Sequence, residues 1–185
     1  LWQQNEVIEN GYRERVTAVT VTTQRGTVIN LDKNGQALRP AILWLDQRLC
    51  QDNQAMPWYW RLAFFLIGQS KVVDYFRRKS QANWLEQHEP DVWKNTDKFL
   101  LLSGFLTHRL TGQFKDSVGS IVGYFPFDYR KQNWAKTWDW KWHALPVKRS
   151  MLPSLVKPGE VLGAITRDAA VHTGLKEGTA LIASA

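Results

Sequence analysis

Val16-Thr-Ala-Val-Thr-Val-Thr22 and Thr27-Val-Ile-Asn-Leu31 are two runs dominated by β-branched residues. Such runs are typical of β-strands. The Asn-Gly pair at residues 34–35 predicts a tight turn after the second run. Residues 38–44, which read Leu-Arg-Pro-Ala-Ile-Leu-Trp, indicate a third strand. The chain is therefore predicted to begin as a β-meander that ends at residues 44–48.

Helices and short strands alternate over the rest of the chain. Helical segments, some marked by a proline at their start or a glycine at their end, are expected at residues 84–88, 91–94, 102–110 and 166–173. Short apolar runs predict strands at residues 99–102, 160–165 and 179–183. Residues 124–142, rich in Trp and Tyr, are expected to form an aromatic loop and a short helix. This alternation predicts an α/β fold.

The length of 185 residues fits one domain with a sizeable core. Hydrophobic residues make up 44% of the chain and charged residues 22%, which is ordinary for a globular protein. The net charge of +7 comes from basic residues spread along the chain, and the densest run is only Arg77-Arg78-Lys79. This distribution favours a solvated surface over a site for nucleic acid or lipid.

The single cysteine, Cys50, excludes an intrachain disulfide framework, and the four histidines lack zinc-ligand spacing. The most apolar run, residues 62–68, is too short to cross a bilayer, and residues 1–6 lack the basic segment of a signal peptide. We therefore expect a cytoplasmic setting. The sequence also lacks the pattern of a Gly-rich phosphate loop or a Ser-His-Asp triad.

Two polar segments follow predicted strands, where ligands commonly bind in α/β folds. They are Gln24-Arg25-Gly26-Thr27 and Trp44-Leu45-Asp46-Gln47-Arg48. Arg and Asp side chains can satisfy the hydroxyl groups of a polyol while a Trp face packs against its C–H surface. The segments therefore suit a sugar. A structural alternative is equally open: Asp46 and Arg48 pair with each other at a helix cap while Trp44 fills the core.

The segment Arg39-Pro-Ala-Ile-Leu-Trp-Leu-Asp-Gln-Arg48 resembles a pattern in the FGGY family of carbohydrate kinases, where xylulose kinases read close to RPAILWNDGR. Further segments resemble family landmarks in the same order, at residues 84–93, 98–102, 106–112, 127–134 and 158–163. The resemblance implies an actin-like, ribonuclease-H-like domain with a mixed sheet and flanking helices. Residues 1–185 would form a single partial domain, most of the N-terminal sugar-binding domain, without its first strands and without the C-terminal ATP domain.

The resemblance also assigns substrate-binding residues. Arg25 matches the glycerol kinase arginine that holds a substrate hydroxyl, and Trp44, Asp46 and Arg48 match a W-x-D-x-R pattern that includes a substrate-facing tryptophan. Gln24 belongs to the same segment as Arg25. Gly26 stands where relatives carry a substrate-contacting Glu or His, and Phe76, next to Tyr75, lies near a substrate-wall aromatic. The family signature centred on Trp84 is degenerate, which indicates an outlying subgroup.

In the intact relative, the implied reaction is ATP-dependent phosphorylation of a sugar or polyol hydroxyl, with ATP and Mg²⁺ as cofactors. No catalytic residue or metal ligand is expected in this chain. The general base, an Asp, is expected just after Ala185, so the 185 residues alone are predicted to be inactive.

Two alternatives stay open, a non-catalytic sugar-binding or regulatory remnant and a basic, Trp-rich nucleic-acid binder. Neither a nucleic-acid nor a membrane partner is expected. Sheet edges exposed in a partial domain would favour self-association, as in a homodimer.

Overall fold

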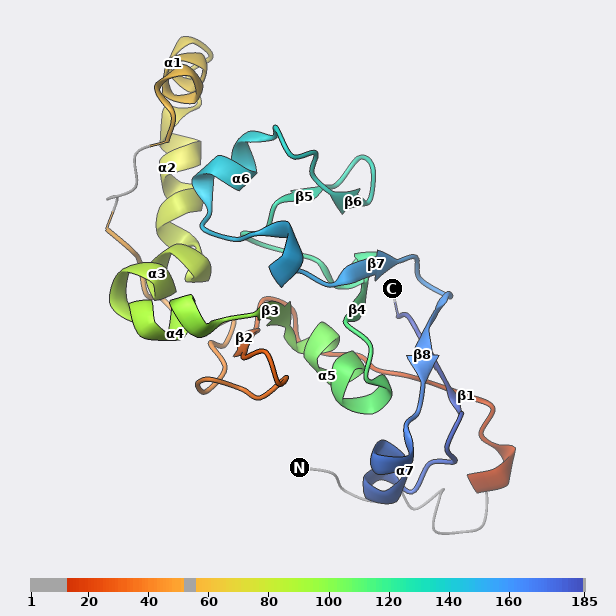
Figure 1. Cartoon of the computed structure of the whole chain (residues 1–185). Coiled ribbons are helices and arrows are strands. Elements are labelled where there is room, and N and C mark those ends of the chain that lie inside the picture. The colour runs from red at the N-terminus through yellow and green to blue at the C-terminus, as the bar shows by residue number, and fades with distance from the viewer. Residues whose placement is uncertain (1–12, 52–55, 185) are drawn as a thin grey trace. The chain divides into compact units, whose positions relative to one another are not determined.

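The computed structural model describes residues 13–51 and 56–184, and Figure 1 shows their helices and strands. The chain divides into two units that are each compact. Among the described residues, unit 1 holds residues 13–25, 101–120 and 153–184. Unit 2 holds residues 26–51, 56–100 and 121–152.

A three-stranded sheet and two helices form the core of unit 1. The strand order is β1 (Ala18–Thr20), β9 (Ala180–Ile182), β8 (Val161–Ala164), with β1 parallel and β8 antiparallel to β9. Helix α5 (Leu102–Thr111) contacts both β8 and α7 (Arg167–Thr173). Apolar side chains from these elements and from residues next to them make one cluster: Leu110, Leu162, Ile165, Ala169, Ala170, Leu181 and Ala183.

A second pair of strands completes unit 1. Strand β4 (Lys115–Ser117) lies parallel to β7 (Ser154–Val156), and residues 118–120 continue β4 as a short 3₁₀ helix. Another 3₁₀ helix spans Arg13–Arg15. Both α-helices of this unit end at a glycine in the left-handed region, Gly112 with φ 71° and Gly174 with φ 73°. Glycine adopts this conformation without steric cost and so terminates helices well.

Unit 2 begins with a buried strand and continues with four helices. Strand β2 (Val28–Leu31) is buried at every residue and pairs with β3 (Lys98–Leu101), whose last residue belongs to unit 1. The helices are α1 (Trp58–Leu66), α2 (Ser70–Lys79), α3 (Gln81–His88) and α4 (Pro90–Asn95). Two short strands, β5 (Phe127–Asp128) and β6 (Asn133–Trp134), precede helix α6 (Trp140–Ala144) and a 3₁₀ helix at Arg149–Met151. No helix among residues 13–51 and 56–184 is long and apolar enough to span a membrane.

Most of the predicted elements are confirmed, including the turn at Gly35, where φ is 75°. Strands β1, β2, β8 and β9 are shorter than predicted, whereas helices α3, α4 and α5 are longer. The third strand is wrong. Residues 38–44 contribute only one isolated bridge, from Ile42 to Val28, and a second isolated bridge joins Ala37, just before them, to Leu31. Pro40 lacks the N–H group that a continuous ladder needs.

The predicted β-meander is also wrong. β1 pairs with β9, from the other end of the chain, rather than with β2, which pairs with β3. Helices α1 and α2 and strands β4 and β7 were not expected from the sequence.

Candidate functional site

The loop that follows β2 in unit 2 carries the predicted Trp-x-Asp-x-Arg residues. Ile42 is held by a pair of backbone hydrogen bonds to Val28, of 3.0 and 3.1 Å. A turn comes next, in which Asp46 N donates to Leu43 O over 3.0 Å. In this turn the side chain of Trp44 points outward, and 57% of the residue's surface is exposed. Trp44 therefore does not fill the core, and its face is available to a ligand.

Asp46 and Arg48 form an ion pair across one residue. Asp46 Oδ1 accepts hydrogen bonds from Arg48 N at 2.9 Å and from Arg48 Nε at 2.7 Å. Partial burial raises the pKa of Asp46, but the two hydrogen bonds and the charges of Arg48 and Arg39 outweigh it and lower this pKa below its ordinary value. The carboxylate is therefore ionised at neutral pH, and its oxygen Oδ2 can accept a further hydrogen bond.

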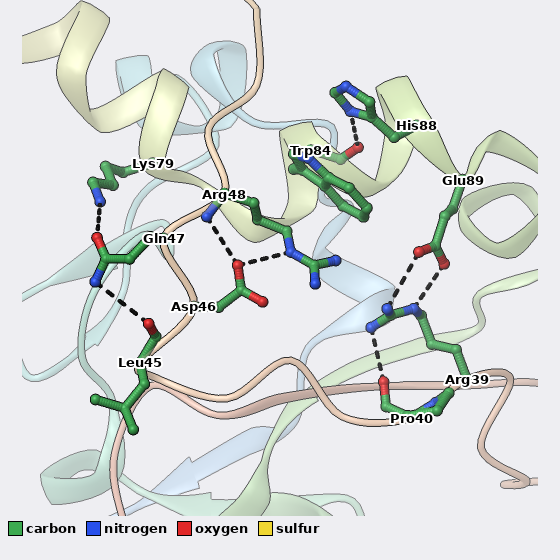
Figure 2. A network of polar contacts seen from close by, with 10 residues as sticks. All are labelled: Arg39, Pro40, Leu45, Asp46, Gln47, Arg48, Lys79, Trp84, His88 and Glu89. Atoms are coloured by element: carbon green, nitrogen blue, oxygen red, sulfur yellow. Dashed lines mark hydrogen bonds and ion pairs between the residues drawn. The ribbon is translucent and has the colours of Figure 1, made fainter.

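Helix α3 supports the guanidinium group of Arg48. The carbon Cζ of Arg48 lies 4.1 Å from the ring centroid of Trp84, a cation–π contact. His88, one helical turn later, stacks on Trp84 with centroids 4.7 Å apart and planes 9° apart. Figure 2 shows Arg48 held between the carboxylate of Asp46 and the indole of Trp84. The position of this charge is therefore fixed by two elements of unit 2.

A second arginine of the same loop is also tied to a helix. Arg39 Nε and Nη2 donate to the two carboxylate oxygens of Glu89 over 2.7 and 3.2 Å, and Nη1 donates to Pro40 O over 2.8 Å. In this pair at the start of α4, two hydrogen bonds join the guanidinium group to both carboxylate oxygens. They fix the relative orientation of Arg39 and Glu89 more closely than a single hydrogen bond would. Figure 2 shows Arg39 bound to both Glu89 and Pro40. The pair therefore anchors the loop upstream of Trp44.

Gly26 lies against Trp44. Its φ of 77° is in the left-handed region, and a Cβ atom built on it would lie 3.4 Å from Trp44 Cβ. A side chain here would occupy the space beside the indole. Gln24 and Arg25 precede it in unit 1, where both side chains are exposed. Within unit 2, the structure thus brings Gly26 to Trp44 and Asp46 to Arg48.

Phe76 of α2 belongs to an aromatic cluster of unit 2. Its ring is half-buried and meets Tyr124 at 5.4 Å and Trp140 at 5.2 Å, both with interplanar angles of 66°. Tyr75 is 59% exposed. Phe76 can therefore form part of the wall of a substrate site. These ring contacts are with Trp140 of α6 and with Tyr124, and not with the loop of Trp44.

The sequence did not identify the residues that hold this network in place. Trp84 and His88 are four residues apart on a helix, a spacing that places side chains on one face and is a usable signal. Arg39 and Glu89 are fifty positions apart, so their pairing could not be read from local spacing. The Asp46–Arg48 ion pair of the structural alternative is observed. Its other two parts are wrong, because residues 44–51 form no helix for the pair to cap and Trp44 is exposed.

The model of the FGGY family of carbohydrate kinases, N-terminal domain, matches residues 4–185. The xylulose kinase of Escherichia coli (strain K12) is 28% identical over 160 residues, which are 86% of this chain and 32% of that protein. The uncharacterized sugar kinase YgcE of the same organism is 38% identical over 102 residues, 52% of this chain and 19% of its own length. The chain thus spans about a third or less of the curated relatives it matches.

Solved structures of xylulose kinases are also similar to this chain. The xylulose kinase from Rhodospirillum rubrum is 26% identical with a TM-score of 0.63, over 91% of this chain and 34% of that one. The ligand bound xylulose kinase from Lactobacillus acidophilus has a TM-score of 0.70 at 17% identity, over 97% of this chain and 37% of that one. The predicted α/β fold of the actin-like, ribonuclease-H-like type is confirmed.

Proposed function

Because this chain belongs to the FGGY family of carbohydrate kinases, we propose that the intact protein transfers the γ-phosphoryl group of ATP to a hydroxyl of a sugar or polyol. The chain would form most of the N-terminal, sugar-binding domain of that protein. The observation that carries the proposal is the exposed Trp44 beside an anchored Asp46–Arg48 pair in a chain of this family.

The proposed roles follow from the chemistry of each side chain. The exposed indole of Trp44 packs against the C–H face of the sugar. Asp46 Oδ2 accepts a hydrogen bond from one hydroxyl, since both of its contacts to Arg48 end on Oδ1. Arg48 supplies donors that the Trp84 face holds in place. Among the further proposed contacts, Gln24 and Arg25 bind hydroxyls and Phe76 contributes to the wall.

Gly26 bears on which sugar is bound. The relatives named by the resemblance carry a substrate-contacting Glu or His at this position, whereas Gly26 offers no side chain and leaves space beside Trp44. We propose that the substrate fills this space with a group of its own. The substrate is therefore expected to differ from both glycerol and xylulose.

Phosphoryl transfer also requires ATP, Mg²⁺ and a general base. Across residues 13–51 and 56–184, no group of three or more His, Cys, Asp or Glu side chains could hold a metal ion. The proposal assigns the metal, the ATP phosphates and an Asp general base after residue 185 to further segments of a longer protein. It places that protein in the cytoplasm, since a chain with one cysteine needs no oxidising compartment.

An ADP-release assay across pentoses, hexoses, polyols and sugar acids tests the proposal. It compares the 185-residue chain with a version extended at both ends to the length of its relatives. We expect turnover with one substrate class in the extended version alone. Trp44→Ala in that version should lower kcat/KM by about tenfold or more, as expected for a lost stacking face.

A matched variant separates binding from general damage. Trp138 is 68% exposed in the same unit, so Trp138→Ala removes an equally accessible indole and should leave kcat/KM unchanged. Sugar binding without turnover in the extended version would instead support the non-catalytic sugar-binding alternative. The absence of both would overturn the proposal.

A further inference from the structure

Helix α1 of unit 2 carries large apolar side chains on the side that is not packed. None of its residues is buried. Six large side chains of α1 and the turn after it are exposed by 48–74%: Trp58, Tyr59, Leu62, Phe65, Leu66 and Ile67. Scattered exposed apolar residues are ordinary, but a contiguous group of this size marks a site of interaction.

The exposed and packed residues of α1 separate by helical geometry. At 3.6 residues per turn, Trp58, Leu62 and Phe65 share one side of the helix, and Trp60 and Phe64 lie on the opposite side. The packed side is occupied, because Phe64 meets Trp140 of α6 at 5.2 Å and stacks on Trp60 at 5.8 Å. The apolar face of Trp58, Leu62 and Phe65 is therefore a second face, additional to the one that binds the helix to its unit.

The charges around this face are mostly positive. Residues 57–79 contain five basic residues and one acidic residue, Asp74. Helix α1 itself contains Arg61 and no acidic residue. On α2, the exposed residues Lys71, Tyr75 and Arg78 recur at helical spacing and so share one side. The exposed Asp74 lies on this side as well, so the charge of this side is positive on balance rather than uniformly positive. A second copy of this chain would oppose basic groups with basic groups, so charge complementarity favours an anionic partner.

We propose that the exposed face of α1, with Lys71 and Arg78 of α2, docks on an anionic lipid surface. Trp and Tyr prefer the boundary between headgroups and acyl chains, where the ring is apolar and its polar atom is wet. The long stem of Arg61 can lie along the apolar side while its charge reaches the headgroups. A short helix with Trp, Phe and Leu on one side and basic residues beside them binds in the plane of the interface without crossing it.

This mode differs from the ones that sequence inspection excludes. The sequence predicts no membrane partner because it has no apolar run long enough to cross a bilayer and no long run of basic residues. Neither of these two criteria detects a helix that lies flat on a membrane surface. The residues of this face are also different from those of the proposed sugar site. Trp44, Asp46 and Arg48 lie in the loop after β2, and Phe76 of α2 packs against Tyr124 and Trp140. Docking and sugar phosphorylation can therefore be tested independently.

Sedimentation of the 185-residue chain with vesicles tests the proposal. The vesicles contain phosphatidylcholine alone or phosphatidylcholine mixed with phosphatidylglycerol. We expect binding to the mixed vesicles only, weakened by added salt because the basic contribution is screened. Trp58→Ser with Phe65→Ser should reduce this binding by about tenfold or more for each ring. Both rings are exposed by over 70%, so their loss should leave the fold intact.

Three further pairs of changes complete the test. Lys71→Glu with Arg78→Glu should also abolish binding to the mixed vesicles, whereas Arg130→Glu with Lys131→Glu, an equal charge change at exposed positions of the same unit, should retain it. Trp138→Ser with Tyr129→Ser removes two equally exposed rings and should retain it as well. Equal loss in these control pairs, equal binding to both vesicle types, or no binding would overturn the proposal. So would a lipid-free dimer that the Trp58→Ser and Phe65→Ser changes dissociate, which would identify the partner as a second copy.

Discussion

Asp116, at the middle of β4 in unit 1, is only 1% exposed. Ser103 Oγ donates to its Oδ2 and Ser117 N to its Oδ1, each over 2.8 Å. Burial raises the pKa of Asp116 from 3.8 to about 6, although hydrogen bonds from Ser103, Ser117, Ser120 and Gly104 act in the opposite direction. The desolvation of the carboxylate therefore outweighs the hydrogen bonds that stabilise it.

The raised pKa predicts that unit 1 loses stability as the pH rises. The folded state keeps the proton of Asp116 to a higher pH than the unfolded state, so the favourable contribution is complete below about pH 4 and is lost as the pH rises through about 6. Two pKa units correspond to roughly 3 kcal/mol. Asp116→Asn should remove that part of the pH dependence, measured as the free energy of unfolding in urea at several pH values between these limits.

A partly exposed carboxylate, Asp128, provides the control for Asp116. The pKa of Asp128 is lowered by backbone hydrogen bonds from Lys131 and Arg130, so its effect on stability has the opposite sign. Asp128→Asn should leave the decline between pH 4 and 6 in place. If Asp116→Asn behaves in the same way as Asp128→Asn, the carboxyl group of Asp116 does not titrate in this range.

Gly26 leads to a second prediction for a single residue. Gly26→Ala places a side chain at φ 77°, which should cost about 1 kcal/mol in the free energy of unfolding. The new methyl group also lies beside Trp44 and should weaken sugar binding, measured by isothermal titration. Gly68→Ala has a similar φ of 69° with nothing within 4 Å of the new Cβ, so it should cost the same stability without affecting the sugar.

At the scale of the elements, α5 and β8 of unit 1 touch through Gly163. A Cβ atom on Gly163 would lie 2.7 Å from Thr111 Cβ, closer than van der Waals contact allows. Gly163→Ala should therefore push the end of α5 away from β8 and lower the free energy of unfolding by about 2 kcal/mol. Val161→Ala on the same strand removes atoms from a side chain that is 54% exposed and should change stability by less than about 0.5 kcal/mol. Equal effects of the two changes would show that the contact yields without cost.

The elements that the sequence predicted are those with local signals. β-Branched runs marked β1 and β2, Pro90 marked the start of α4, and glycines marked the ends of α5 and α7. Helix α1 lacked such a signal, because its sequence is apolar on both faces and shows no amphipathic alternation. Strand β4 reads Lys-Asp-Ser and exists because β7, far along the chain, pairs with it.

The same distinction applies to the candidate site. The Trp44-x-Asp46-x-Arg48 spacing is local, and the sequence was sufficient to identify those residues as candidates. Their support is not local: Trp84 holds Arg48, and Glu89 holds Arg39. Tertiary contacts of this kind depend on how the loop packs on α3 and α4, which a single sequence does not reveal.

For the whole molecule, the last prediction concerns the proposed separation of the sugar-binding residues from the general base. The chain spans about a third of the length of the xylulose kinases it resembles, and the proposal gives it sugar-binding residues without a general base. The 185-residue chain should therefore bind its sugar, release no ADP from ATP, and bind the sugar equally well with and without ATP. Titration followed by tryptophan fluorescence measures the binding directly.

Replacement of single indoles makes this prediction specific. Trp44→Phe should remove most of the sugar-dependent fluorescence change and weaken binding by about tenfold, because Trp44 is proposed to lie on the sugar. Trp138→Phe removes an indole of similar exposure and should leave both unchanged. A sugar that binds equally to the two variants would place the site away from the loop of Trp44. ADP release by the 185-residue chain itself would mean that the base and the phosphate site lie within these residues, and the proposed location of the catalytic Asp beyond residue 185 would then be wrong.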